Sequence, residues 1–284
     1  MECVKNNDDI QRLKNNRIIG DIVLGHNAEI VFEGFNNVFA VKLGCKLLVE
    51  NVKIKFFGDN GVAFIANNHL RNAQVCIYHS SWFYYGYNGF LNGSCQDGTQ
   101  VFVDEGKGIF IGDNHRFSER IQIRTSDMHP FYDITSRKRL NGAQSVFIGD
   151  GVWLGHGCTI LKNTRIGSGA IIGTQAVVAS KTIPSNTIWA GNPAKQVREN
   201  VTWGDAGAKF FSSMFDQERS AQAEILPASV DMRSYTKDQS TISTAQFESE
   251  IALRQTAMER VDFLTVVSEK KTQNRFFIAQ EVDI

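Results

Sequence analysis

The chain has 284 residues, of which 42% are hydrophobic, enough to bury one large core or two ordinary ones. Thirty basic residues balance thirty acidic ones, so no global positive charge favours nucleic acid or an anionic membrane. Four prolines and 24 glycines exclude collagen-like and proline-rich chains. Because no apolar run reaches the length of a membrane span or a signal peptide, we expect a cytoplasmic protein without membrane insertion.

The first regular pattern begins at Ile18 and is loose. Ile18, Leu24 and Ile30 follow one another in steps of six, and later isoleucines recur at longer intervals, at positions 30, 54 and 77. Neither an α-helix, with its period of 3.6, nor a simple strand, with its period of two, repeats in this way. We interpret 18–110 as wide coils of a solenoid.

Residues 78–90 hold seven aromatic side chains, Tyr84 and Tyr85 among them. Aromatic ring faces stack on sugars, so these tyrosines are candidates for a glycan platform. Core filling or a subunit interface is the commoner use of such a cluster, and the sequence leaves both interpretations open.

The six-residue step returns at Ile111, Phe117 and Ile123 and is then interrupted. The next member of the series is Ile148, and the 25 residues between 123 and 148 are not a multiple of six. This irregular spacing predicts an inserted loop at about 126–146.

From residue 148 the repeat is regular. One aliphatic residue falls every six positions, and a small or medium residue follows each aliphatic by four positions: the first series is Ile148, Leu154, Ile160, Ile166, Ile172 and Val178, and the second is Val152, Cys158, Thr164, Ala170, Ala176 and Thr182. Six residues make a short strand and a bend, and three such units close a narrow triangular coil. The sequence therefore predicts an all-β solenoid over 18–204, with 1–17 capping one open end.

The repeat stops before residue 205, and 205–284 is predicted to be a partly helical extension of unknown role. A helix is expected over 244–260, because Ser243 and Gln246 have capping-box spacing and four apolar residues share one face, Phe247, Ile251, Met258 and Val261. A packing or oligomerisation appendage is the plainest interpretation of this region.

Four stretches of sequence carry a resemblance to a known family. The run IGDGVWLGHGCTILKNTRIGSGAIIGTQAV at 148–177 resembles the hexapeptide-repeat acyltransferases, which form a left-handed parallel β-helix. SDMHP at 126–130 and KTIPSNTIWAGNPAK at 181–195 are similar to the O-acetyltransferase branch that includes galactoside and maltose acetyltransferases. The run IGDNHRFSERIQIRTSDMHPFYD at 111–133 is similar to enzymes that acetylate capsule or lipopolysaccharide sugars, including sialic acid. The resemblance implies an acetyl-CoA-dependent O-acetyltransferase without metal, usually a homotrimer, with a glycan or sugar as acceptor.

The chemistry of acetyl transfer needs a base, because a sugar hydroxyl is a poor nucleophile at neutral pH. Histidine suits this role, and the resemblance selects His129, 24 residues before Trp153, from six candidates: His26, His69, His79, His115, His129 and His156. Asp127, Asp133 or a backbone carbonyl would orient the imidazole, and the sequence does not choose among them. In the family position, Trp153 walls the pocket and a backbone N–H of Gly155 or His156 stabilises the oxyanion.

Coenzyme A carries phosphates that call for basic side chains beside its groove. The resemblance places the donor near Trp153, Gly155 and His156, and adds five further residues: Gly173, Ala179, Lys181, Lys195 and Arg198. For the acceptor, Arg116, Arg120 and Arg124 could clamp a carboxylate such as that of sialic acid. Solvated charges on a sheet face would look the same.

Three other functions stay open. An N-acyltransferase would use the same donor on an amino sugar. A metal enzyme of the γ-carbonic-anhydrase type needs three convergent histidines, and the sequence has no H-x-x-x-x-H pair. A noncatalytic glycan-binding solenoid would use the repeats only as a scaffold.

Overall fold

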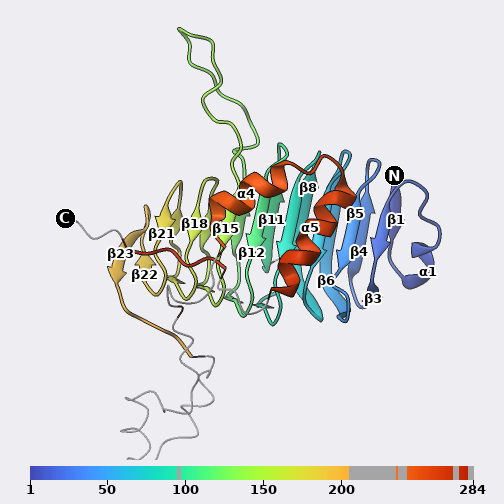
Figure 1. Ribbon diagram of the computed structural model, residues 1–284, viewed down its shortest axis with the longest axis horizontal. Helices are drawn as coiled ribbons and strands as arrows, with labels where there is room; N and C mark the ends of the chain where they lie inside the picture. The colour runs from blue at the N-terminus through green and yellow to red at the C-terminus, as the bar shows by residue number, and fades with distance from the viewer. Residues whose placement is uncertain (95–96, 205–234, 236–241, 271–274, 281–284) are drawn as a thin grey trace, which may run out of the picture.

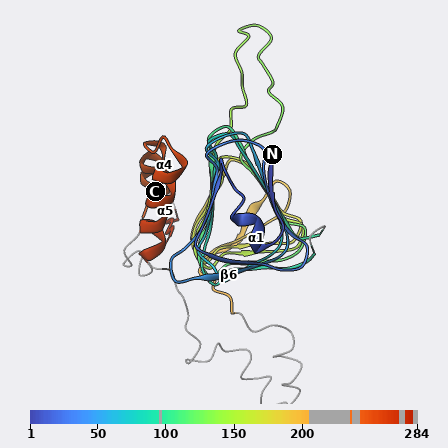
Figure 2. The same ribbon diagram turned by 90° about the vertical axis from the view of Figure 1, so that its right-hand side faces the viewer.

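The computed structural model describes residues 1–94, 97–204, 235, 242–270 and 275–280. Over most of this length the chain winds into a solenoid with a triangular cross-section (Figure 2). Three sheets form the faces of this prism, and we name them sheet A, sheet B and sheet C in the order in which each regular coil passes through them. Successive coils pair in parallel, while β1 and β23 pair antiparallel at the two ends.

Sheet A has nine strands: β1 (Glu2–Val4), β3 (Asp21–Leu24), β4 (Ala28–Phe32), β6 (Lys46–Phe57), β8 (His69–Tyr78), β11 (Thr99–Val103), β14 (Gln122–Arg124), β17 (Thr159–Ile160) and β20 (Val177–Val178). Sheet B has eight: β2 (Arg17–Ile19), β5 (Val38–Val41), β7 (Val62–Ile65), β9 (Trp82–Tyr85), β12 (Gly108–Ile111), β15 (Val146–Ile148), β18 (Arg165–Ile166) and β21 (Thr182–Ile183). Sheet C has six: β10 (Phe90–Leu91), β13 (Arg116–Phe117), β16 (Trp153–Leu154), β19 (Ile171–Ile172), β22 (Ile188–Ala190) and β23 (Lys195–Arg198).

The two predicted residue series fill the interior of the prism. All six aliphatic members, from Ile148 to Val178, are fully buried, and so are the first five of the small series. The last member, Thr182, was predicted to point inward but is exposed, and Ile183 is buried instead. The coil is one residue shorter there, so the six-residue phase ends at Val178.

The first residues lie over the N-terminal end of the prism. Strand β1 pairs antiparallel with β4, and α1 (Asn7–Ile10) follows with a capping box formed by Asn6 and Asp9. Figure 2 shows α1 across the opening of the triangle. An antiparallel strand and a capped turn of helix stop further coils from adding to this edge. The domain boundaries at 17 and 204 stay predictions.

Two helices cover sheet B (Figures 1 and 2). The structure has α4 (Thr244–Ala252) and α5 (Ala257–Glu269), so the prediction of one helix over 244–260 was wrong in its extent. The predicted cap is present, because Ser243 Oγ accepts the Gln246 N–H at 3.1 Å. A second cap at Thr256 starts α5 and separates the two helices.

The aromatic cluster explains why the helices bind this sheet. Neighbouring strand residues point to opposite faces, so Phe83 and Tyr85 enter the prism while Trp82 and Tyr84 face the helices. Phe247 of α4 is fully buried against the outward rings, with its ring 5.4 Å from that of Trp82. The cluster thus fills two cores, one inside the prism and one under the helices.

A short C-terminal segment, 275–278, also belongs to the prism. It continues the backbone ladder at the corner between sheets B and C, where Ser168 N–H donates to Phe276 O at 2.9 Å. Arg275 is 1% exposed and forms ion pairs with Asp113 and Asp150. Burial raises the pKa of Asp150 to about 7, against the opposing pull of the Arg275 guanidinium. The segment 275–278 therefore holds the C-terminal extension against the coils.

Candidate active site

The inserted loop is the most prominent feature outside the prism. Residues 125–145 join β14 to β15 and project from the corner between sheets A and B (Figures 1 and 2). Two ion pairs tie the loop to the coils: Arg139 donates from Nη1 and Nη2 to the two carboxylate oxygens of Glu105, and Lys162 contacts Asp127. The loop is therefore fixed at its base, although its tip extends away from the body.

Asn141 connects the two strands of the loop base. Its side chain is 3% exposed and donates from Nδ2 to Asp127 Oδ2 at 2.9 Å and to His129 O at 2.8 Å. Its Oδ1 accepts the Phe131 N–H at 2.9 Å. One buried amide thus holds the backbone at His129 and Phe131 and also binds the carboxylate of Asp127.

His129 itself is exposed, with its backbone held by Asn141. The preceding residue, Met128, has a φ of 65°, a left-handed conformation that non-glycine residues seldom adopt. The Ser126 hydroxyl supports this conformation by accepting the Met128 N–H at 3.2 Å. Such backbone geometry is common where a side chain must be presented in one direction.

Neither nearby acid orients the imidazole within the described part of the chain. Hydrogen bonds from Lys162 and Asn141 hold the pKa of the Asp127 carboxyl below its ordinary value, so this group anchors the loop as a carboxylate. Asp133 accepts the Ser136 N–H at 2.6 Å near the loop tip and acts as a turn former. The choice of an orienting group for His129 stays open.

Trp153 lies at a different corner of the prism. It begins β16 on sheet C, points outward, and is 41% exposed. The strand register places Arg116 and Ile171 directly beside it in the adjacent coils. Trp203, which the sequence did not single out, lies 6.1 Å from it between ring centroids and donates its Nε1–H to Gly151 O at 2.7 Å.

A single chain does not bring His129 and Trp153 together. His129 lies at the corner between sheets A and B, and the chain then crosses the whole of sheet B, through β15, before it reaches Trp153. The predicted catalytic residues are therefore on two corners of one prism.

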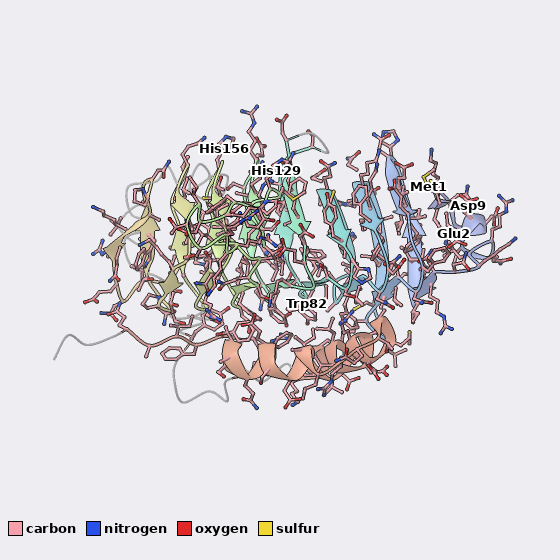
Figure 3. The ribbon with its side chains drawn as sticks, turned by 90° about the horizontal axis from the view of Figure 1, so that it is seen from above. Met1, Glu2, Asp9, Trp82, His129 and His156 are labelled. Atoms are coloured by element: carbon pink, nitrogen blue, oxygen red, sulfur yellow. The ribbon has the colours of Figure 1, made fainter. Side chains whose placement is uncertain are left out.

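The residues predicted to bind acetyl-CoA also lie at different places on the prism. Gly155, His156 and Gly173 stack at the corner between sheets C and A, where Gln175 N–H donates to His156 O at 2.8 Å. Figure 3 shows Trp82 toward the two helices and His156 on the opposite side of the prism. The Gly155 N–H donates to Ile172 O at 2.8 Å, whereas the His156 N–H has no acceptor among the described residues. Of the two amides proposed for the oxyanion, that of His156 is the one available.

The remaining donor candidates lie toward the C-terminal end of the prism. Ala179 and Lys181 follow β20 at the corner that also carries the loop, and Lys181 Nζ lies 5.7 Å from the ring centroid of Trp189. Lys195 and Arg198 are exposed on β23, the outermost strand of sheet C.

The three candidate arginines occupy three separate places. Arg116 is beside Trp153 on sheet C and donates to Asn88 O at 2.9 Å. Arg120 lies at the corner between sheets C and A in an ion pair with Asp97 at 3.0 Å. Arg124 lies on sheet A with its guanidinium 4.3 Å from the Phe102 ring centroid. In the part of the chain that the structure describes, the three arginines do not form one clamp.

The predicted glycan platform at Tyr84 and Tyr85 was wrong. Both side chains are at most 1% exposed, because one packs under the helices and the other inside the prism. Burial also raises the pKa of both phenols well above the ordinary value. Neither ring face is open to a sugar.

No helix in the described part of the chain is long and apolar enough to cross a membrane. No group of three metal-binding side chains occurs in the ranges that the structure describes. The expected cytoplasmic location and lack of a metal stay predictions.

A triangular prism of parallel strands with one long inserted loop is the architecture of the left-handed β-helix proteins, and the comparisons with known proteins place the chain among their acyltransferases. A profile described as bacterial transferase hexapeptide (six repeats) matches residues 145–180. A polysialic acid O-acetyltransferase of Neisseria meningitidis is 31% identical over 206 residues, which is 72% of this chain and 92% of that protein. The polysialic acid O-acetyltransferase of Escherichia coli O1:K1 is 33% identical over 106 residues, 37% of this chain and 34% of that protein.

A solved structure agrees with these matches. The polySia-specific acetyltransferase NeuO superposes with a TM-score of 0.59 at 28% identity, covering 75% of this chain and 88% of NeuO. The chain belongs to the hexapeptide-repeat O-acetyltransferase family and is an enzyme of that family. The predicted fold and family are thereby confirmed.

Proposed function

We propose that this enzyme transfers the acetyl group of acetyl-CoA to a hydroxyl of a surface glycan, a capsule or lipopolysaccharide sugar with sialic acid as the first candidate. The polysialic acid O-acetyltransferases similar to it support the acceptor class. The observation that carries the mechanism is His129, an exposed imidazole on a loop whose backbone is fixed by the buried Asn141.

In this mechanism His129 removes the proton of the acceptor hydroxyl as its oxygen attacks the thioester carbonyl. Negative charge develops on the carbonyl oxygen. The His156 N–H has no acceptor among the described residues, which supports its role as the donor to this oxygen. The tetrahedral species then breaks its C–S bond, the imidazolium returns the proton to the sulfur, and the ester and free coenzyme A leave. No covalent enzyme intermediate is needed.

We further propose a homotrimer in which each site is completed by two subunits. The separation of His129 and Trp153 on two corners supports this assembly, because a neighbouring prism could bring its Trp153 to the loop. Exposed apolar side chains on the loop, Phe131 at 53% and Ile134 at 96%, also favour a contact with another copy. Trp153 and Arg116 of the neighbour would then wall the site.

The function is tested by incubating the enzyme with acetyl-CoA and purified polysialic acid or neutral glycans. We expect acetyl-CoA-dependent ester formation, which hydroxylamine reverses, on an acidic glycan. Because His129→Ala removes the general base, we expect this variant to lower kcat about 10²- to 10⁴-fold. Acetyl-CoA should still raise its melting temperature. His26→Ala, at an exposed position in the N-terminal coils, is the matched control. An amide product, or full turnover of His129→Ala, would refute the proposal.

A further inference from the structure

A small cavity lies between sheet B and the two helices, at the corner from which the inserted loop projects. Its volume is about 170 Å³. Sites for cofactors and other large ligands usually measure roughly 300–1,000 Å³, so this cavity has room for a small ion. We name it the loop-root cavity. Its polar lining comes from the starts of the sheet B strands and from the helices: Ser80, Lys107, Ser145, Glu248, Arg254 and Arg260.

Arg260, near the start of α5, is a buried cation in this lining. It is 7% exposed, and its guanidinium donates from Nη1 to Asn60 O at 2.8 Å and from Nη2 to Gln255 O at 3.3 Å. No acidic side chain among the described residues forms an ion pair with it. Burial lowers the pKa of Arg260, and only the charge of Glu259 acts in the opposite direction. Because a buried charge without a partner is costly, this guanidinium favours an anion from solution.

The other charged side chains leave the cavity positive. Arg254 pairs with Glu250 at 3.1 Å, and Glu248 pairs with Arg165 at 3.2 Å, so these charges are compensated. Lys107 is half-buried, and its ammonium group has neither an ion pair nor a hydrogen bond within the described ranges. Two cations therefore line one cavity, and its only acidic side chain is already paired.

Two serine hydroxyls add neutral donors. Ser145 is 5% exposed, and its Oγ accepts the Gly108 N–H at 3.2 Å, which leaves its own O–H for another acceptor. Ser80 Oγ has no hydrogen-bond partner in the part of the chain that the structure describes. Cations and hydroxyls around a small volume match a tetrahedral oxyanion, because each oxygen of such an ion accepts hydrogen bonds.

The cavity connects the helices with the root of the inserted loop. Ser145 is the last residue of this loop, and the neighbouring Gln144 N–H donates to Thr125 O at 2.9 Å, which closes the loop at its base. Figure 2 shows the loop leaving the prism at the corner where the face covered by the helices ends. An ion in the cavity would therefore contact the coils, the loop root and the helix pair together.

We propose that the loop-root cavity binds one small tetrahedral oxyanion, phosphate or sulfate, which neutralises Lys107 and Arg260 and holds the helix pair to the root of the loop. The site uses none of the residues assigned to acetyl-CoA or to the glycan. It is independent of the proposed acetyl transfer.

The binding test is calorimetric titration of the full chain with sodium phosphate, with chloride as the only other anion and at constant ionic strength. We expect one saturable site per chain and competition by sulfate. Lys107→Gln should weaken phosphate binding about tenfold or more, because it removes a charge-assisted hydrogen bond, whereas Lys107→Arg should retain most of the affinity. Lys14→Gln removes the same charge at an exposed position near the N-terminus and should bind as wild type.

Hydrogen exchange then locates the ion. Phosphate should slow exchange of the amides at 143–146 and 252–260 in wild type and not in Lys107→Gln. His129→Ala and saturating coenzyme A should leave phosphate binding unchanged, so this inference and the proposed function can fail separately.

Four results would overturn the proposal. These are no saturable phosphate binding, equal losses in Lys107→Gln and Lys14→Gln, displacement of phosphate by coenzyme A, and competition by glycerol 3-phosphate as strong as that by sulfate. The third would assign the ion to the donor site, and the fourth would assign the cavity to phosphoryl groups of larger molecules.

Discussion

His115 is a histidine that the fold removes from solvent. It is fully buried, with its ring 4.8 Å from those of Tyr85 and Phe117 between centroids. Nδ1–H donates to Gly112 O at 2.7 Å, and Nε2 has no partner among the described residues. Burial lowers the pKa of His115 to about 3, so the ring is neutral in the folded protein and cannot serve as a base for solvent-borne substrate.

This buried ring makes stability depend on pH. The unfolded chain takes up a proton near pH 6.5, while the folded chain does not until about pH 3. The free energy of unfolding is therefore highest above the pKa that His115 has in the unfolded chain. It decreases as the pH falls, by about 2 kcal/mol between neutral pH and pH 5. Urea unfolding of wild type and His115→Phe at pH 7.5 and 5.0 measures this difference.

The substitution should remove this part of the pH dependence whatever its effect at neutral pH. His26→Gln, at an exposed site, should keep the wild-type dependence. Parallel pH curves for wild type and His115→Phe would contradict the assignment of a neutral buried imidazole.

Phe247 holds the two helices, α4 and α5, on sheet B. Its buried ring contacts the rings of Trp82, Phe110 and Phe147, all of which point outward from the sheet. Removing such a ring leaves a cavity between the helix and the strands. We expect Phe247→Ala to destabilise this contact by about 3–5 kcal/mol.

Hydrogen exchange of α4 and α5, compared with that of the inner strands, measures the loss. The helical amides should exchange faster in Phe247→Ala while the amides of β12 and β15 keep most of their protection. Leu253→Ala, 69% exposed at the end of α4, should change stability by less than about 0.5 kcal/mol. Equal effects of the two substitutions would refute the role given to Phe247.

The sequence identified elements with a strict local period and missed those that depend on packing. The series from Ile148 to Val178 was predictable, because each coil repeats one inward position and every member is buried. The aromatic cluster at 78–90 was ambiguous, since its alternate residues serve two cores, one of which exists only when residues beyond 242 dock. Trp203 gave no signal because it lies after the repeat ends.

The separation of the candidate site onto two corners follows from the repeat, once the six-residue units are assigned to the three faces of the prism. Six residues advance the chain by one face, so the loop before β15 and Trp153 after it must lie on different corners. The resemblance to known acetyltransferases gave the residue types without this geometry. The loop anchors Asn141 and Lys162 could not be read from the sequence, because their contacts depend on how the loop returns to the coils.

The separation of His129 and Trp153 on two corners of the prism can be tested by mixing inactive variants. If each site combines the loop of one subunit with Trp153 of its neighbour, His129→Ala and Trp153→Ala each remove activity from every site of a pure trimer. In a mixed trimer, some interfaces join a subunit with an intact His129 to a neighbour with an intact Trp153.

We expect co-refolding of the two inactive variants in equal amounts to restore about one quarter of wild-type activity, since random assembly in a cyclic trimer makes about one interface in four intact. The measurement is acetyl transfer before and after mixing, with the trimer verified by light scattering. His129→Ala refolded with wild type is the control and should lose activity only in proportion to its share. If one subunit supplied both residues, every site in the mixture of variants would still lack one of them, and activity would stay at the level of the separate variants.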